Sequence, residues 1–373
     1  MAACQERPSL PTPTPVTPTR TPEPIVPTAT RPETAVVTST PSVTVMPTMM
    51  ATATAVAPTA TPVAISSVPT VVPLSRIGVS GEPDDVEPAR QAGLDFGFFL
   101  DWDVLPEPLS SVPIWQMVRL TEAGVMGVDE ASWETAVANH PGAVWIVGNE
   151  PDVIWQDNVT PERYAELYHE VYQFVMERDP TAQIAIGGVT QPTPLRLAYL
   201  DRVLAAYEAQ FGGPMPVDIW TVHAFILREE RDSWGVDIPP GMSEQQGILY
   251  EIDDHDDMVI FAENIRAFRQ WMWERGYGDR PLAVTEYGIL MPADYGFPLE
   301  RVAAFMRQSF IFFQTARDET IGYAADDYRL VQWWVWYSLH DPDLYPTGNL
   351  YDRQTGQLTP LGEVWRQLVT GEE

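Results

Sequence analysis

The chain has 373 residues and a formal net charge of −30, with 52 acidic side chains against 22 basic ones. A field of that sign disfavours nucleic acid, anionic membrane surfaces and strongly anionic substrates as partners, whereas neutral glycans are indifferent to it. The single cysteine, Cys4, excludes a disulfide framework, and no apolar run is long enough to predict a transmembrane helix.

Residues 1–73 are predicted to form a disordered stalk rich in Pro and Thr. The stretch 5–73 holds 15 prolines and contains neither glycine nor an aromatic residue, so it cannot bury enough surface to order itself. The start, Met1-Ala2-Ala3-Cys4, resembles the last residues of a bacterial lipobox. We therefore expect an extracellular protein tethered to the cell surface through a lipid on Cys4, although the apolar part of a signal peptide is not present in the given chain.

Residues 74–373 read as one globular domain in which short apolar runs alternate with helical patterns. Eight strands alternating with helices predict a (β/α)₈ TIM barrel, and a doubly wound open sheet is the alternative. That alternative lacks support, because the stretch 79–83 after the first strand is not a Gly-rich phosphate turn. The predicted strands are 76–80, 95–100, 114–120, 143–148, 183–186, 217–222, 282–285 and 331–336. The predicted helices are 160–179, 195–209, 258–274, 300–316 and 361–368.

Two of the predicted strands end in a glutamate. The run 144–151 (VWIVGNEP) contains Glu150 and the run 282–288 (LAVTEYG) contains Glu286. In a parallel barrel, a polar residue at the carboxyl end of a strand faces the catalytic mouth. Two such carboxyl groups can face each other across one cleft, which is what glycoside hydrolysis requires. The other interpretation of either residue is a solvated loop carboxylate.

The Asn149-Glu150-Pro151 motif on the fourth predicted strand, with Glu286 on the seventh, resembles the retaining glycoside hydrolases of clan A. The resemblance covers the whole region from Leu74 onward. It implies that Glu150 is the acid/base and Glu286 the nucleophile in double displacement on a neutral β-linked glycan. Burial beside Trp145 or Trp155, with the charge of Glu286, is expected to keep Glu150 protonated near neutral pH.

The resemblance also suggests a supporting shell. Asn149 resembles the clan residue that bonds the sugar 2-hydroxyl, and His223 ends the sixth predicted strand, where it could bond the substrate or orient Glu286. Arg119 ends the third strand and could donate to a sugar or to Glu286. The alternatives are a structural histidine at 223 and a surface ion pair at 119.

Aromatic residues complete the predicted glycan site. Trp336, near the carboxyl end of the last strand, is predicted to form the floor of a sugar subsite, with core packing as the alternative. Tyr287 is a weaker candidate for bonding the nucleophile, because adjacent strand residues face opposite ways. Trp155 is placed on the leaving-group side, and the stretch 101–103 (DWD) is expected to line the mouth.

The predicted scheme needs no metal and no organic cofactor. The acidic stretch 253–257 (DDHDD) matches no metal loop and leads into a helix, where acids favour the first turn. The expected partner is an oligosaccharide or polysaccharide, and the protein is expected to be a monomer. A second hypothesis from another class is a barrel that binds glycan at the cell surface without cleaving it.

Overall fold

The computed structural model describes residues 72–109, 112–127, 129–342 and 344–371. The predicted stalk and Cys4 lie outside the described residues, except for Val72 and Pro73. Val72 is buried in the core, so the packed domain includes at least this residue before the predicted boundary. No helix in the described part of the chain is long and apolar enough to cross a membrane.

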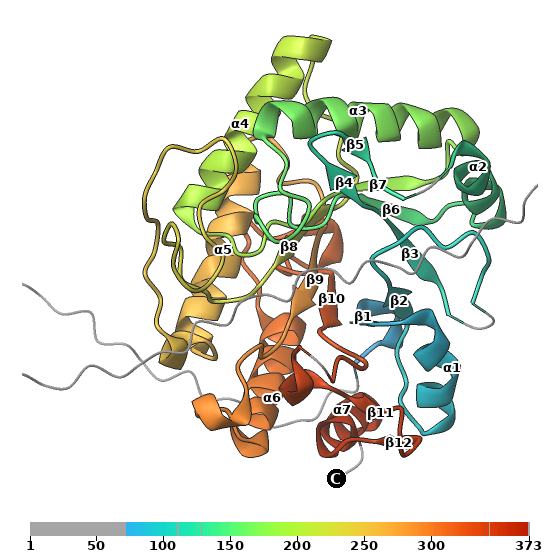
Figure 1. Cartoon of the computed structure of the whole chain (residues 1–373), viewed down its shortest axis with the longest axis vertical. Coiled ribbons are helices and arrows are strands. Elements are labelled where there is room, and N and C mark those ends of the chain that lie inside the picture. Colours follow the sequence, from blue (N-terminus) through green and yellow to red (C-terminus); the bar gives the residue numbers. More distant parts are fainter. Residues whose placement is uncertain (1–71, 110–111, 128, 343, 372–373) are drawn as a thin grey trace, which may run out of the picture. The chain divides into compact units, whose positions relative to one another are not determined.

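Eight parallel strands form a nearly closed barrel (Figure 1). They are hydrogen-bonded in the order β7-β6-β3-β2-β1-β10-β9-β8. Parallel bridges from Ala185 to Ile219 and from Val189 to Val222 join β7 to β8 and bring the two edges together. The barrel strands are β1 (Ile77–Ser80), β2 (Phe98–Leu100), β3 (Ile114–Val118), β6 (Val144–Val147), β7 (Gln183–Ile186), β8 (Trp220–His223), β9 (Leu282–Tyr287) and β10 (Trp333–Trp336).

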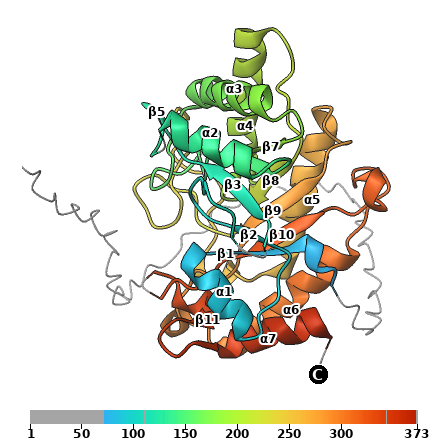
Figure 2. The same cartoon turned by 90° about the vertical axis from the view of Figure 1, so that its right-hand side faces the viewer.

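Seven α-helices surround these strands in the described part of the chain, and α3 packs on α4 as α6 packs on α7 (Figures 1 and 2). The helices are α1 (Pro83–Gln91), α2 (Glu130–Asn139), α3 (Pro161–Arg178), α4 (Pro194–Phe211), α5 (Met258–Glu274), α6 (Leu299–Thr315) and α7 (Pro360–Thr370). Four of them begin with a proline, whose fixed φ suits the first helical position.

Short elements occupy the connections. Two hairpins of two-residue strands lie outside the barrel, β4 (Leu120–Thr121) with β5 (Gly124–Val125) and β11 (Tyr351–Asp352) with β12 (Gln357–Leu358). The 3₁₀ helices are η1 (Leu74–Arg76), η2 (Ile252–Asp254), η3 (Ala293–Tyr295), η4 (Ala324–Asp326) and η5 (Pro346–Gly348).

The core has two apolar layers, as a barrel requires. The inner layer fills the barrel with Phe98, Trp115, Ile146, Ile219 and Val335 among others. The larger layer lies between the strands and the helices. Each strand is buried on both faces, which explains why strands appear in the sequence as continuous apolar runs. The predicted barrel is confirmed.

Candidate functional site

The carboxyl ends of the strands converge on one pocket. Glu150 follows β6, His223 ends β8, and Glu286 lies at the carboxyl end of β9. These strands are the fourth, sixth and seventh of the barrel in chain order, as predicted. The pocket is lined by Trp102, Glu150, Gln156, Phe225, Glu286, Leu290, Tyr337 and Tyr345. Charged groups and aromatic faces therefore meet in one concave site, as in ligand-binding pockets generally.

The two glutamates face each other across this pocket, with His223 between them. One carboxylate oxygen of Glu150 and one of Glu286 lie within 4.8 Å of each other. His223 Nδ1 is 2.9 Å from Glu150 Oε1 and 3.8 Å from Glu286 Oε2. All three side chains are buried. A separation of about 5 Å is that of a nucleophile and acid/base pair, since an inverting pair needs roughly 6.5 Å or more to admit a water.

Each glutamate has its own hydrogen-bond donor. Thr190 Oγ1 donates to Glu150 Oε1 at 2.5 Å, and Trp102 Nε1 donates to Glu286 Oε1 at 2.8 Å. Thr190 follows β7, and Trp102 follows β2. The carboxylates are thus held by residues from separate loops, so their orientation depends on the closed barrel.

The backbone at Glu150 is held in an uncommon conformation. Its φ is 44°, in the left-handed region, and Gly148 two residues earlier has a φ of 90°. The Glu150 N–H donates to the Gly188 carbonyl at 3.1 Å and stabilises this turn. Residues held in such regions cluster at functional sites, because the surrounding structure must compensate for their strain.

The pKa directions of the two glutamates differ from the sequence expectation. Burial raises the pKa of Glu286, and the charge of Glu150 adds to that effect. Burial also acts to raise the pKa of Glu150, but the contact and charge of His223, with Thr190 and Arg196, outweigh it and hold that pKa below its usual range. The direction of the Glu150 pKa is therefore opposite to the one expected from burial beside a tryptophan.

The pKa of His223 is shifted in the opposite direction to that of Glu150. Burial alone would lower the pKa of His223, but the charges of Glu286 and Glu150 outweigh it and raise that pKa. His223 Nδ1 lies 2.9 Å from Glu150 Oε1, so a histidine protonated at Nδ1 donates to this carboxylate and the two groups can share that proton. Because the three groups titrate together, their pKa values belong to the cluster as a whole.

Asn149 and Arg119 lie beside this cluster and are bound by a carboxylate that sequence reasoning missed. Asp157 accepts from Arg119 Nε at 2.6 Å and from the Asn149 N–H at 2.7 Å. Arg119 also donates to Gln156, which lines the pocket. Arg119 thus ion-pairs with a buried aspartate instead of bonding Glu286. Asn149 Oδ1 is buried with no hydrogen-bond partner in the described part of the chain.

Trp336 and Tyr287 do not lie in the pocket, contrary to the prediction. Both are fully buried in the layer between strands and helices, where their rings pack edge to face at 5.1 Å. Trp336 Nε1 donates to the Gly348 carbonyl at 2.8 Å. The two residues pair across β9 and β10, so both point away from the barrel axis. Tyr337, one residue further, is the side chain that turns into the pocket.

Trp155 lies in the loop after Glu150 and is 72% exposed. Its neighbour Gln156 lines the pocket, so Trp155 stands near the rim without lining the pocket itself. The stretch 101–103 does reach the pocket, through Trp102. The aromatic residues that line the pocket are Trp102, Phe225, Tyr337 and Tyr345, which all lie after the ends of strands. Of these, only Trp102 was predicted from the sequence.

No metal centre is assigned to this site. Among the described residues, Glu150, His223 and Glu286 are the group whose spacing comes nearest to one. Their ligand atoms lie within 4.8 Å of one another, but Glu150 Oε1 already bonds His223 and Thr190, and Glu286 Oε1 accepts from Trp102. In the acidic stretch 253–257, Asp256 pairs with Arg301 and Asp257 caps α5.

No protein-family model matches the sequence, and neither does any curated protein. Solved structures do match the fold. A GH128 (subgroup II) endo-β-1,3-glucanase from Pseudomonas viridiflava is similar with a TM-score of 0.51 at 18% identity, over 78% of this chain and 96% of that one. A GH128 (subgroup I) endo-β-1,3-glucanase from Amycolatopsis mediterranei, in complex with laminaritriose, gives 0.51 at 17% identity over 79% and 99%. A GH128 (subgroup II) endo-β-1,3-glucanase from Sorangium cellulosum gives 0.50 at 16% identity over 79% and 98%. At these identities the likeness shows a shared barrel fold.

Proposed function

We propose that this protein is a retaining glycoside hydrolase acting on a β-1,3-glucan, with Glu286 as nucleophile and Glu150 as acid/base. The observation that carries the proposal is the pair of buried carboxylates within 4.8 Å at the carboxyl ends of the fourth and seventh strands. The similar structures support the choice of substrate, because they are β-1,3-glucanases and one of them contains laminaritriose.

In this scheme Glu286 attacks the anomeric carbon and Glu150 protonates the leaving oxygen. The proton shared with His223 supplies the acid, since moving it from Nδ1 to Oε1 across 2.9 Å leaves Glu150 neutral. Trp102 keeps a hydrogen bond on Glu286, which favours the ionised nucleophile. After the sugar is attached to Glu286, Glu150 removes a proton from water, which then releases the sugar.

The test is reducing-sugar release from laminarin by the wild-type protein, Glu286→Ala and Glu150→Ala, with a β-1,4-glucan and an α-glucan as controls. Each substitution is expected to lower kcat by at least 100-fold, the lower end of what a general acid contributes. NMR of the first product should show the β anomer. Glucan bound by the wild type without any cleavage would instead support the glycan-binding hypothesis.

Azide distinguishes the roles of the two glutamates. In Glu286→Ala, azide fills the place of the nucleophile and should yield an α-glycosyl azide in one displacement. In Glu150→Ala, azide replaces water in the second displacement and should yield the β-glycosyl azide. The opposite assignment of anomers to the two variants would show that the roles are exchanged.

A further inference from the structure

A buried ionic network lies behind the acid/base and outside the pocket. Asp152, Arg196 and Glu229 are all fully buried, and they come from the loop after β6, the first turn of α4 and the loop after β8. Arg196 Nε is 2.7 Å from Asp152 Oδ2, and its Nη1 is 2.7 Å from Glu229 Oε1. Burying three charges is costly even when they are paired, so the network is weakly explained by stability alone.

The Glu229 end of the network is fixed in place by the loop 224–257. Glu229 Oε1 accepts from Thr193, and Oε2 accepts from the Ile248 N–H at 2.8 Å. Arg196 Nη2 donates to the Val236 carbonyl at 3.1 Å. A Cβ on Gly247 would lie 2.2 Å from Glu229 Oε2, so this approach requires glycine. Arg196 is therefore held through three of its side-chain nitrogens.

At its other end, the network contacts Glu150 through Thr190. The Thr190 N–H lies 3.3 Å from each carboxylate oxygen of Asp152, and Thr190 Oγ1 donates to Glu150 Oε1. Glu150 Oε1 in turn accepts from His223 Nδ1. A continuous chain of polar contacts thus joins Arg196 to the proton between Glu150 and His223.

The charges of the network act on that proton in opposite directions. Burial, His223 and Thr190 have the larger effects on the pKa of Glu150, and the Arg196 charge lowers it further. Burial and the two glutamates have the larger effects on the pKa of His223, and the Asp152 charge raises it further. Burial raises the pKa of Asp152 itself to about 6 against the pull of Arg196, so Asp152 is mainly ionised near neutral pH.

Other charged and titratable groups interact with Glu150, His223 or Glu286 and must stay constant in any test. They are Glu286 from β9, Arg119 from the end of β3, and Tyr337 and Tyr345 from the segment after β10.

We propose that Asp152 and Arg196 are positioning residues that orient the Glu150–His223 pair and set which partner holds their shared proton. Neither residue lines the pocket, so both act through Thr190 and Glu150. The proposal deepens, and rests on, the proposed function, since a shared proton matters to catalysis only if Glu150 is the acid/base.

The first test needs no substrate, so it stands apart from the proposed activity. The chain has five histidines, and ¹³C-histidine NMR with His223→Gln identifies the His223 signal. Asp152→Asn and Glu229→Gln each remove a negative charge and should lower the titration midpoint of His223 by roughly 0.5 unit or more. Arg196→Gln removes a positive charge and should raise that midpoint, while Arg196→Lys should leave it nearly unchanged.

The matched control is Asp326→Asn, which neutralises another Arg-paired aspartate beyond the amino-terminal ends of β1 and β10. It should leave the His223 midpoint unchanged. Unchanged midpoints in natively folded Asp152→Asn and Glu229→Gln would overturn the proposal. The proposal would also be overturned if removing a negative charge and removing the Arg196 charge shifted the His223 midpoint in the same direction. If Arg196→Gln does not fold, Asp152→Asn, Glu229→Gln and Arg196→Lys still decide the matter.

With laminarin as substrate, the basic limb of the kcat/KM profile should move in the same direction as the NMR midpoint, with KM nearly unchanged. Absence of glucan cleavage by the wild type would contradict the proposed function, while the NMR shifts would still decide whether the network sets the proton. If Asp152→Asn raised KM without shifting the pH profile of kcat/KM, Asp152 would have a purely structural role.

Discussion

Trp102 connects the loop after β2 to Glu286, the proposed nucleophile, through a single hydrogen bond. Its Nε1 donates to Glu286 Oε1 at 2.8 Å, and this contact acts to lower the pKa of Glu286. A hydrogen bond to a charged group contributes about 1.5–3 kcal/mol. We expect Trp102→Phe to lower kcat by roughly 10- to 100-fold and to move the acid limb of the pH profile upward, because Glu286 then ionises at higher pH.

The control for Trp102→Phe is Trp133→Phe on α2. Trp133 is also buried, but its Nε1 has no hydrogen-bond partner in the described part of the chain. This control should keep the wild-type pH profile. An unshifted acid limb in Trp102→Phe, measured on laminarin, would contradict the role given to Trp102.

At the residue scale, the sequence predicted those site residues whose position follows from a strand end. Glu150, His223 and Glu286 were found because each closes an apolar run. Trp336 was placed on the wrong face, because alternation separates the two faces of β10 without telling which one points inward. A register shift between Trp334 and Trp336 marks the irregular end of that strand. Thr190 and Asp157 depend on contacts between distant loops, which no local pattern reveals.

At the scale of elements, two hydrogen bonds of His255 connect the loop after β8 to the loop after β9. Its Nδ1 donates to the Ile226 carbonyl at 2.9 Å, and its Nε2 accepts from the Leu290 N–H at 3.0 Å. Leu290 lines the pocket, as does Phe225 next to Ile226. The neutral imidazole is required in this position, because a protonated Nε2 could not accept from Leu290.

This contact predicts a loss of stability in acid. Burial lowers the pKa of His255 to about 4, below the 6.5 of an exposed histidine. The unfolded chain therefore binds the proton first, and the stabilisation present above pH 6.5 is lost as pH falls towards 4. The change in unfolding free energy is roughly 3 kcal/mol over this range. We expect His255→Gln to be less stable at pH 7 but to show a shallower decline, measured by urea unfolding.

His169→Gln is the comparison for this prediction. His169 is half-buried between α3 and α4, and bonds Tyr207. Its replacement leaves both hydrogen bonds of His255 in place, so the decline attributed to His255 should remain. Equal slopes in His255→Gln and the wild type between pH 6.5 and 4 would show that His255 does not cause the decline.

Helices with clear end signals were predicted closely, while two others were missed. The predicted helix 258–274 coincides with α5, and α3, α4, α6 and α7 differ from prediction by at most two residues at each end. The missed α1 contains Pro88 in its interior, and α2 buries only Trp133, Ala136 and Val137. Packing on the closed barrel stabilises both, and a sequence pattern does not contain that information.

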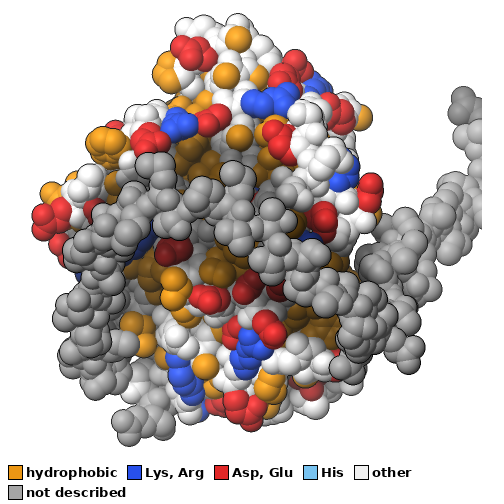
Figure 3. Space-filling model, turned by 90° about the vertical axis from the view of Figure 1, so that its left-hand side faces the viewer, with side chains coloured by type: hydrophobic (Ala, Val, Ile, Leu, Met, Phe, Trp, Pro, Cys, Tyr) orange, Lys and Arg blue, Asp and Glu red, His pale blue; other side chains and the backbone are white. Residues whose placement is uncertain are grey.

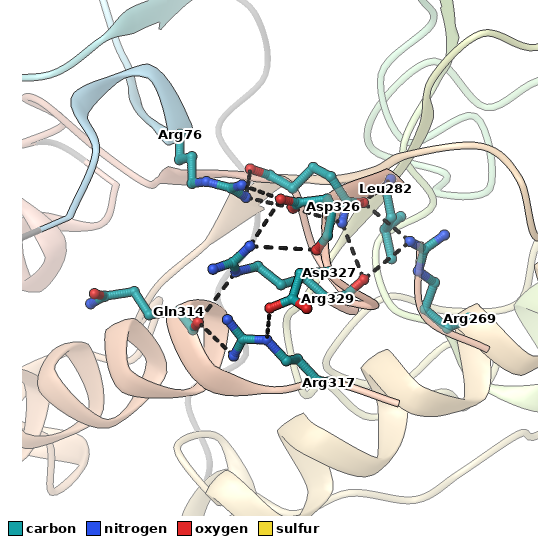
Figure 4. Close-up of polar contacts among 9 residues, drawn as sticks. Arg76, Arg269, Leu282, Gln314, Arg317, Asp326, Asp327 and Arg329 are labelled. Carbon is teal, nitrogen blue, oxygen red and sulfur yellow. Dashed lines mark hydrogen bonds and ion pairs between the residues drawn. The ribbon is translucent and has the colours of Figure 1, made fainter. Parts of the chain in front are cut away.

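At the scale of the whole molecule, a polar network ties together the amino-terminal ends of strands from the two ends of the chain. Asp326 bonds Arg76, which precedes β1, as well as Arg329 and Gln332, which precede β10 (Figure 4). Gln332 Oε1 also accepts from the Leu282 N–H at the start of β9. This end of a barrel serves stability, whereas the opposite end carries the chemistry.

We therefore expect Asp326→Asn to reduce the unfolding free energy by roughly 1–3 kcal/mol, because it leaves two arginines without their carboxylate partner. Urea unfolding measures this loss, and kcat/KM on laminarin should stay within about twofold of the wild type at temperatures where the variant is folded. A large fall in kcat/KM with unchanged stability would contradict the division between the two ends of the barrel.

The global charge was predicted from composition and concerns partners more than fold. Acidic side chains are spread over the face seen in Figure 3, with arginines beside several of them. The net charge of −30 would repel a polyanionic glycan and leaves a neutral glucan unaffected. The identity of the sugar could not be predicted from the sequence, because the loops that line the pocket have no periodic pattern.

The ring of helices has a gap between α1 and α2 (Figure 1), since no helix follows β2 in the described part of the chain. The connection there carries Trp102 to Glu286. Segments without regular hydrogen bonding open at lower free energy than the strands beneath them. We therefore expect mild denaturant to detach Trp102 from Glu286 while the barrel stays folded, so that loss of this contact and global unfolding occur as two separate transitions.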